Sequence, residues 1–178
     1  MQRIDDKGAV APSLQGAIIA MGNFDGFHRG HQAVVRRSTG WAKAEGRPTI
    51  VATFDPHPMR LFRPETPPFR LTTLGQRERL FAESGADAML VFGFTPELAA
   101  KSAQEFIALL ATHLGAAGVV TGQDFTFGKG RSGTVAQLIE LGAPMGLRAE
   151  SVAAVTVEAG MVVSSSRIRE ALRSGDCA

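Results

Sequence analysis

Short apolar runs alternate with longer amphipathic segments along the whole chain, and this alternation is the strongest constraint on its fold. The apolar runs are rich in β-branched residues and have the length of buried strands. We predict strands at residues 17–21, 49–54, 88–92 and 118–121, and at least one more within 147–157. Helical patterns cover residues 30–44, 76–84, 102–114, 135–141 and 164–173. Strands and helices that alternate at this spacing predict an α/β fold with a doubly wound, mostly parallel sheet.

The size and composition of the chain fit one folded domain with a buried core. It has 178 residues, of which 44% are hydrophobic and 20% are charged, which are ordinary values for a globular domain. Residues 1–14 show no clear periodicity. We therefore expect a flexible leader over residues 1–14 and a single domain over residues 15–178.

Charge, cysteine content and hydropathy exclude several classes of protein. The net charge is only +2 and no block of like charges stands out, so we expect no nucleic-acid partner. Cys177 is the only cysteine, which rules out an internal disulfide and favours a reducing, cytoplasmic setting. Residues 1–7 do not resemble a signal peptide, and the longest apolar stretch, residues 17–21, is too short to cross a membrane.

Two irregular loops follow predicted strands. Residues 55–69 contain five prolines, which interrupt regular structure, and residues 122–133 are rich in glycine and phenylalanine. Both loops, and the turn after the first strand, lie at strand carboxyl ends, where doubly wound sheets bind their ligands. The candidate site is therefore expected to combine segments that are far apart in the sequence.

The first strand ends in a glycine-rich turn that runs into a helix, over residues 22–31 (Gly-Asn-Phe-Asp-Gly-Phe-His-Arg-Gly-His). Its three glycines allow close approach of a ligand, and the N-terminus of the helix attracts phosphate. His28 and His31 are spaced to lie on one side of the helix and to donate hydrogen bonds to a phosphate. A glycine turn with two surface histidines is the alternative interpretation. The turn matches neither the P-loop nor the Gly-x-Gly-x-x-Gly pattern.

A second anion site is predicted where the last helix begins, over residues 163–169 (Val-Ser-Ser-Ser-Arg-Ile-Arg). Its serines can cap the helix, and its arginines can bind phosphate. Arg167 and Arg169 diverge on a helix, so we do not expect both to reach one ligand. An ordinary capped surface helix is the alternative interpretation.

Two helix N-termini, two histidines and an arginine suit a triphosphate, and no covalent nucleophile accompanies them. This set predicts direct in-line attack by an acceptor phosphate on the α-phosphorus of ATP, with Mg²⁺ neutralising phosphate charge. For the acceptor, residues 53–58 and 122–133 combine aromatic rings with a carboxylate, and such rings can cover a flat ring system. The alternative is that each phenylalanine belongs to the core and that His57, between two prolines, only fixes the shape of its loop.

Together these segments resemble the FMN adenylyltransferase module of the prokaryotic bifunctional riboflavin kinase/FAD synthetase family. Residues 22–31, 53–58, 122–133 and 163–169 carry the resemblance, and residues 94–107 resemble the family's helix that leads to the fourth strand. The resemblance covers nearly the whole chain, Leu14 to Asp176. It implies a Rossmann-like sheet of the nucleotidylyltransferase type, and the reaction of ATP with FMN, in the presence of Mg²⁺, to give FAD and pyrophosphate.

The resemblance also implies roles for individual residues. The catalytic residues would be His28, His31 and Arg169. The ATP site would comprise Gly22, Asn23, Phe24, Asp25, Gly26, Gly30, Ser164, Ser165, Ser166 and Arg167. The FMN site would comprise Phe54, Asp55, Pro56, His57, Pro58, Asp124, Phe125, Phe127 and Arg131. No residue is assigned as a metal ligand.

The chain departs from the family pattern in two respects. Ser166 replaces the usual threonine, which keeps the hydroxyl, and the sequence stops near Cys177, where the family continues into a β-barrel riboflavin kinase module. We therefore expect no kinase domain in this chain and treat a separate kinase module as a possible partner. Three other functions stay open: a nucleotidyltransferase with a non-flavin phosphate acceptor, a non-catalytic flavin- or nucleotide-binding module, and a fragment of a class I tRNA synthetase.

Overall fold

The computed structural model describes residues 1–67, 69–156 and 160–176. Its centre is a six-stranded sheet in the order β1-β4-β3-β2-β5-β6, in which every pair of neighbouring strands is parallel. The strands are β1 (Gln2–Asp5), β2 (Ile18–Met21), β3 (Thr49–Asp55), β4 (Ala88–Gly93), β5 (Gly118–Gly122) and β6 (Arg148–Val152). The predicted doubly wound α/β fold is therefore confirmed.

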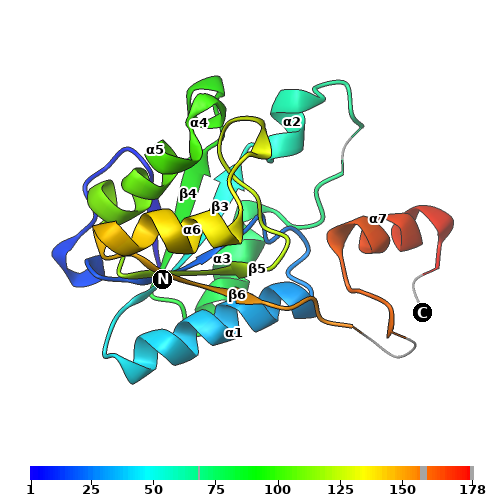
Figure 1. The fold of residues 1–178 in the computed structure, drawn as a ribbon. Coiled ribbons are helices and arrows are strands. Elements are labelled where there is room, and N and C mark those ends of the chain that lie inside the picture. The colour runs from blue at the N-terminus through cyan, green and yellow to red at the C-terminus, as the bar shows by residue number, and fades with distance from the viewer. Residues whose placement is uncertain (68, 157–159, 177–178) are drawn as a thin grey trace.

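Helices lie on both sides of this sheet (Figure 1). They are α1 (Arg29–Ala44), α2 (Pro58–Phe62), α3 (Leu74–Glu83), α4 (Pro96–Ala100), α5 (Ala103–Ala108), α6 (Val135–Gly142) and α7 (Ser165–Ser174). Single turns complete the described elements: η1 (Pro12–Leu14), η2 (Leu109–His113), η3 (Lys129–Arg131) and η4 (Ala143–Met145). Helices α1 and α3 share one face of the sheet, whereas α5 and α6 share the other.

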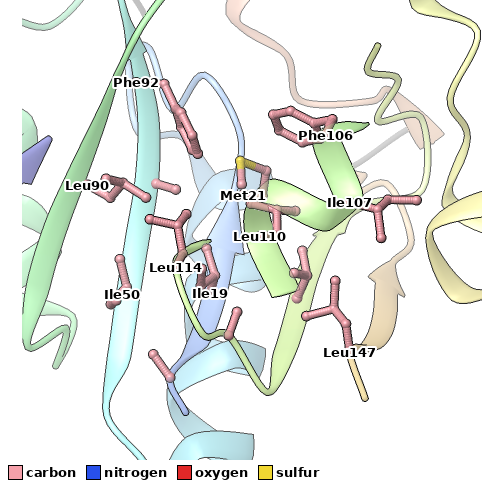
Figure 2. Packing of buried hydrophobic residues seen from close by; sticks show 14 of the residues in the cluster. Ile19, Met21, Ile50, Leu90, Phe92, Phe106, Ile107, Leu110, Leu114 and Leu147 are labelled. Atoms are coloured by element: carbon pink, nitrogen blue, oxygen red, sulfur yellow. The ribbon is translucent and has the colours of Figure 1, made fainter. Parts of the chain in front are cut away.

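Both faces of the sheet are buried, which explains why its central strands read as continuous apolar runs. Ile19 and Met21 of β2 pack in one cluster with Leu110 and other residues around α5, as Figure 2 shows. Their neighbours in the strand point the opposite way, as strand geometry requires. Ile18 therefore packs against α1, in a second cluster that includes Trp41.

Three helices begin with reciprocal caps that can be recognised in the sequence. The side chains of Ser102 and Glu105 bond to each other's backbone N–H groups, so the predicted capping box is present at α5. Similar boxes begin α3 and α6. The helix expected over residues 102–114 is not one regular α-helix, because it continues from α5 into the π-helical turn η2.

Two expectations about irregular segments need correction. Residues 1–14 are not a flexible leader: β1 pairs with β4 at the edge of the sheet, and Val10 and Leu14 are buried in the core. The sequence signal was weak because an edge strand need not be apolar, and β1 is largely exposed. The loop expected over residues 55–69 contains the short helix α2, which starts at Pro58, a position where proline is compatible with a helix. Pro68 lies outside the described residues, as does Ala159 of the expected turn at residues 159–160.

The order of the strands creates a crevice at the carboxyl edge of the sheet. Strand β2 lies between β3 and β5, so the chain leaves β2 toward one side and later returns to the other. The segments that follow Met21 and Gly122 diverge at this switch point, where doubly wound sheets bind ligands. Within the described residues, no helix combines the length and apolar character needed to span a membrane.

Candidate functional site

A cavity of about 980 Å³ opens at the carboxyl edge of the sheet. Its wall is drawn from residues within 21–34 after β2, 54–63 after β3, 94–106 after β4, 122–131 after β5, and 152–169 after β6. The expectation that distant segments share one site at this edge therefore agrees with the geometry.

Most residues expected at the site line this cavity. They are Gly22, Asn23, Phe24, His28, Gly30, His31, Phe54, His57, Pro58, Asp124, Phe125, Phe127, Arg131, Ser164, Ser165, Ser166 and Arg169. Those expected residues that do not line it are Asp25, Gly26, Asp55, Pro56 and Arg167.

His28 begins helix α1 and also forms part of the cavity wall. Its Nδ1 accepts a hydrogen bond from the backbone N–H of His31 at 3.4 Å and so caps the helix. In a neutral imidazole whose Nδ1 accepts, the proton is on Nε2, and we assign this tautomer to His28. The rings of His28 and His31 stack with their centroids 3.6 Å apart. The predicted placement of both rings on one side of the helix start is thus present.

Burial keeps both imidazoles neutral in the free protein. Burial, helped by the neighbouring His28, lowers the pKa of His31 to about 3, and burial also lowers the pKa of His28. Phe24 packs edge-on against His31 at a centroid distance of 5.3 Å and contributes to this apolar setting. Among the described residues, His31 Nδ1 finds no hydrogen-bond partner although it is buried. Such atoms are uncommon in folded proteins, so His31 is a strong candidate for a ligand-binding side chain.

The backbone of Gly30 lies close to the His28 ring. A Cβ at this position would lie 3.2 Å from the His28 ring and 3.8 Å from the carbonyl oxygen of Val163. A side chain at this position would crowd the His28 imidazole, whereas 3.8 Å from the Val163 oxygen is an ordinary contact.

The start of α7 packs against the histidine turn. Ser164 caps the helix by accepting the Arg167 N–H at 3.3 Å. The Ser165 hydroxyl donates to the carbonyl oxygen of Asp25 at 2.7 Å, across 140 positions of sequence. The two helix N-termini expected to bind phosphate thus lie at the same cavity.

Asp25, which we expect in the ATP site, is not part of the cavity wall. Its side chain is 1% exposed and accepts the backbone N–H groups of Leu71 and Thr72, each at 3.0 Å. It also pairs with Arg169 Nη2 at 2.6 Å and with Arg77 Nη2 at 3.5 Å. Burial raises the pKa of Asp25, but these donors together outweigh it and hold the pKa below its ordinary value.

The two arginines of α7 diverge, as their spacing predicts. Arg169 lines the cavity, and its Nε donates to the Phe69 carbonyl oxygen at 2.8 Å while Nη2 pairs with Asp25. Arg167 is exposed and outside the wall, with Nη1 bonded to the Val162 carbonyl oxygen at 3.1 Å. The expected ATP contact of Arg167 stays a prediction, which this position outside the wall does not support.

Phenylalanine rings from several segments line the same cavity as the histidines. Phe54 meets Phe94 edge-on at 5.7 Å, and Phe94 meets Phe62 of α2 in the same manner at 5.9 Å. On the loop after β5, Phe125 and Phe127 stack at 5.8 Å. Phe54 and Phe127 are each 7% exposed and belong to the core, so the flat apolar surfaces open to an aromatic ligand are those of Phe62, Phe94 and Phe125.

The loop after β3 contributes a second histidine cap. His57 Nδ1 accepts the Met59 N–H at 3.1 Å and begins α2, and burial lowers the pKa of His57 to about 4. Asp55, which we expect in the FMN site, instead pairs with Arg70 at 2.6 Å and is not part of the cavity wall. Its neighbour Pro56 and, in the histidine turn, Gly26 are likewise absent from the wall.

Several wall residues were not foreseen from the sequence. They are Met59, Phe62 and Arg63 of α2 and its C-cap, Phe94, Leu98 and Ala99 after β4, and Val152 to Val155 after β6. The prolines concealed α2, whereas the position of Val152 at a strand carboxyl end was an available signal. The buried Arg77 also went unnoticed, although its place on the core face of α3, four residues before Phe81, could have marked it.

The described residues contain no group of three or more His, Cys, Asp or Glu side chains positioned to hold a metal ion. Asp124 is the one carboxylate among the described residues of the wall. Mg²⁺ commonly binds through one or two carboxylates together with substrate phosphates. The wall therefore fits a cation that enters with a phosphate ligand.

The fold and the site together define a class. A parallel doubly wound sheet, with a histidine turn at the switch point and a second helix N-terminus beside it, is a Rossmann-like architecture with a candidate phosphate site. Pantothenate synthetase from Thermus thermophilus has a similar fold, with a TM-score of 0.58 at 17% identity over 94% of this chain and 67% of that one.

Comparison with known proteins identifies the family. The family described as FAD synthetase matches residues 10–167, and the chain belongs to this family. It is 36% identical to the bifunctional riboflavin kinase/FMN adenylyltransferase of Escherichia coli K12, over 92% of this chain and 52% of the relative. It is also 36% identical to a putative bifunctional riboflavin kinase/FMN adenylyltransferase of Geobacillus thermodenitrificans, over 92% of this chain and 87% of the relative.

A solved Streptococcus pneumoniae structure, described as a macrolide-efflux protein, shares the fold closely. It has a TM-score of 0.85 and 28% identity, and the match covers 99% of this chain and 57% of that chain. The chain thus spans about half the length of several relatives that it matches, including the Escherichia coli protein.

Proposed function

We propose that this chain transfers the adenylyl group of ATP to the phosphate of FMN, giving FAD and pyrophosphate. One observation carries the proposal: the same cavity is lined by His28, His31 and the start of α7, which we call its phosphate half, and by phenylalanine rings that follow β3, β4 and β5, which we call its aromatic half. A phosphate-binding half and a flat apolar half correspond to the two substrates. Membership of the FAD synthetase family supports the same reaction.

The phosphate half binds the triphosphate of ATP. The His28 Nε2–H and the free N–H groups at the starts of α1 and α7 donate hydrogen bonds to phosphate oxygens. His31, neutral and with an unsatisfied nitrogen among the described residues, adds a further polar contact. A bound triphosphate favours the protonated form of these imidazoles and is stabilised by it. These groups stabilise charge that develops at the transferring phosphorus.

The aromatic half binds the flavin ring. Phe62, Phe94 and Phe125 provide surfaces against which the ring can stack. Phe54 and Phe127, each 7% exposed, pack against Phe94 and Phe125 and belong to the core. Arg131 is a cation of the same wall, its Nε held by the Thr126 hydroxyl at 2.8 Å. It therefore provides charge for the FMN phosphate near the aromatic surfaces.

The reaction is a direct displacement. An oxygen of the FMN phosphate forms a bond to the α-phosphorus of ATP, and the bond from that phosphorus to the bridging oxygen of the β-phosphate breaks, so that pyrophosphate leaves. The protein contributes position and charge stabilisation. When bound with ATP, Mg²⁺ supplies neutralisation of phosphate charge, and Asp124 is the wall carboxylate that would hold it.

We further propose that the chain acts in the cytoplasm as a nucleotidyltransferase domain that works without nucleic acid. The relatives are named as bifunctional, with riboflavin kinase beside FMN adenylyltransferase. A riboflavin kinase module is accordingly the partner that we propose would supply FMN to this domain.

The test is a product assay with purified protein, ATP, Mg²⁺ and FMN, with riboflavin as the control acceptor. FAD and pyrophosphate should form in equal amounts from FMN, and no FAD should form from riboflavin. A folded sample that makes no FAD but transfers adenylyl groups to another phosphate acceptor would disprove the choice of FMN. Binding of ATP without release of pyrophosphate from any acceptor would indicate a non-catalytic module.

A further inference from the structure

Helix α7 supplies part of the phosphate half, yet it is held to the domain in an unusual manner. Figure 1 shows it at one side of the sheet, and the residues just before it pair antiparallel with the segment after β6, through the bridge Thr156–Val162. None of its described side chains is fully buried. Its position must therefore depend on specific polar contacts more than on a packed apolar face.

Those contacts converge on Asp25. The backbone carbonyl of Asp25 accepts the Ser165 hydroxyl at 2.7 Å, and its carboxylate accepts Arg169 Nη2 at 2.6 Å. The two α7 residues lie one turn apart, so the helix is fixed at two points. Because Asp25 sits in the histidine turn, the same residue links the two phosphate-binding segments.

Residues 69–72 complete the link from the other side. The N–H groups of Leu71 and Thr72 donate to the Asp25 carboxylate, and the Phe69 carbonyl accepts Arg169 Nε at 2.8 Å. The Arg169 guanidinium also lies over the Phe69 ring at 5.2 Å. Asp25 and Arg169 are thus bonded to each other and to the same segment, residues 69–72.

Resting on the proposed function, we infer that Asp25 and Arg169 are a positioning pair: their ion pair sets the N-terminus of α7 against the His28–His31 turn. In this arrangement Arg169 acts on ATP through the placement of α7. A guanidinium that bound phosphate directly would need its Nε–H and Nη2–H groups free. In Arg169 these two groups already donate to the Phe69 carbonyl oxygen and to the Asp25 carboxylate. The buried side chain of Asp25, 1% exposed, has no direct access to substrate.

A double-mutant cycle separates the two roles. The variants are Asp25→Asn, Arg169→Gln and the combination, with Arg37→Gln, Glu150→Gln and their combination as the matched control. Arg37 and Glu150 form a two-bond acid–arginine pair, at 2.6 and 2.9 Å, that also joins distant segments but lies outside the cavity wall. Rates, and binding of a non-hydrolysable ATP analogue, are measured for each.

If the pair positions α7, both single variants and the double variant lose rate by a similar factor, about 10²-fold, the usual cost of misplacing a bound group. The Michaelis constant for ATP rises in all three, whereas that for FMN changes little because the aromatic wall is untouched. Arg169→Lys does not restore activity, since one ammonium cannot reproduce two fixed N–H directions. The control variants keep rates and Michaelis constants close to those of the parent protein.

If Arg169 is instead a direct phosphate ligand, Asp25→Asn releases it and costs little, and the double variant is as poor as Arg169→Gln alone. Near-parental activity of Asp25→Asn would overturn the inference. Hydrogen exchange of the α7 amides is the second readout: it should increase in Asp25→Asn and Arg169→Gln but not in the control pair. Unchanged α7 exchange in a folded Arg169→Gln protein would also overturn the inference, even if Asp25→Asn fails to fold. Analogue binding and exchange need no FMN, so they remain informative if the wild-type protein makes no FAD.

Discussion

The two ends of the sheet each carry an acidic residue held by two arginines, but the two sites differ in their exposure to water. At the carboxyl edge, Asp25 pairs with Arg77 and Arg169, and its side chain is 1% exposed. At the amino edge, Glu45 pairs with Arg47 and Arg148, and its side chain is 28% exposed. Both acids connect segments that are distant in the sequence.

The chemistry of the Glu45 site resembles that of Asp25, with a hydrogen bond from Trp41 Nε1 at 2.7 Å and Arg148 lying over the Trp41 ring. Arg148 first, and then Trp41, lower the pKa of Glu45 to about 2. Because water can replace these partners, the Glu45 network should add little stability. Water cannot replace the partners of Asp25, because its side chain is buried. Pairing of the same kind therefore fixes the position of residues at the site, such as Arg169. Five predictions test this contrast.

The largest effect is expected from Asp25→Ala. Removal of this carboxylate leaves the buried Arg77 without its counter-charge, and such a change typically costs about 3–5 kcal/mol of unfolding free energy. Urea denaturation of Asp25→Ala and of Glu45→Ala measures the unfolding free energy lost at the carboxyl edge and at the amino edge, respectively. The contrast would be broken if the Glu45 variant lost as much stability as the Asp25 variant.

Next in size is the loss of turnover in His28→Ala and His31→Ala. We expect kcat to fall about 10²-fold or more, the usual loss when a stabiliser of transition-state charge is removed. His28→Asn is the control, because asparagine can still cap α1 and so separates helix stability from catalysis. An unchanged FAD synthesis rate in a folded alanine variant would contradict the assigned role.

The pH dependence of stability should come from the carboxyl edge. The folded pKa of His31 is about 3, well below its ordinary value of 6.5, so between these values the unfolded chain binds more protons. Unfolding free energy should therefore fall as pH drops from 6.5, by up to about 1.4 kcal/mol per pH unit for one such group. His57, with a pKa of about 4, acts in the same direction.

Denaturation curves from pH 7 to pH 5 test this dependence. His31→Leu should flatten it, while Glu45→Gln should leave it unchanged, because Glu45 is ionised in both states above its ordinary value of 4.5. An equally steep loss in His31→Leu would assign the acid sensitivity to other groups.

A smaller effect is expected within the cavity itself. Phe125→Ala should weaken flavin binding by about threefold to tenfold, the worth of an aromatic pair, and should change ATP binding less. Quenching of flavin fluorescence and binding of the ATP analogue provide the two affinities. Equal losses for both ligands would show that the two halves of the cavity are not separate.

The smallest effect should be that of salt on the amino edge. Any stability lost in Glu45→Gln should disappear at high ionic strength, since exposed pairs are screened. The loss in Asp25→Ala should persist in the same buffer because its partners are buried. If the stability losses of both variants persisted at high ionic strength, the Glu45 network would be shielded from solvent.

The comparison also shows why some site residues could be predicted and others could not. The order of strands β2 to β6 and of the longer helices between them, the histidine turn and the cap at Ser164 follow from apolar periodicity and from the spacing of glycine, histidine and serine. These are local properties, because each depends on residues within a turn or two. The segment resemblance extended this prediction to the aromatic loops, most of whose members line the cavity.

Tertiary structure alone decided which residues of those motifs face a ligand. Asp25 stands in the middle of the histidine turn, yet it points into the interior because Arg169, 144 positions away, meets it there. Arg167 and Arg169 look alike in the sequence, and only the packing of α7 turns one toward the cavity. The pairing of β1 with β4 and the burial of Arg77 have the same origin. The sequence by itself determined the local elements and their chemistry, whereas the chain topology determined their distant partners, because contacts between remote segments depend on the path of the whole chain.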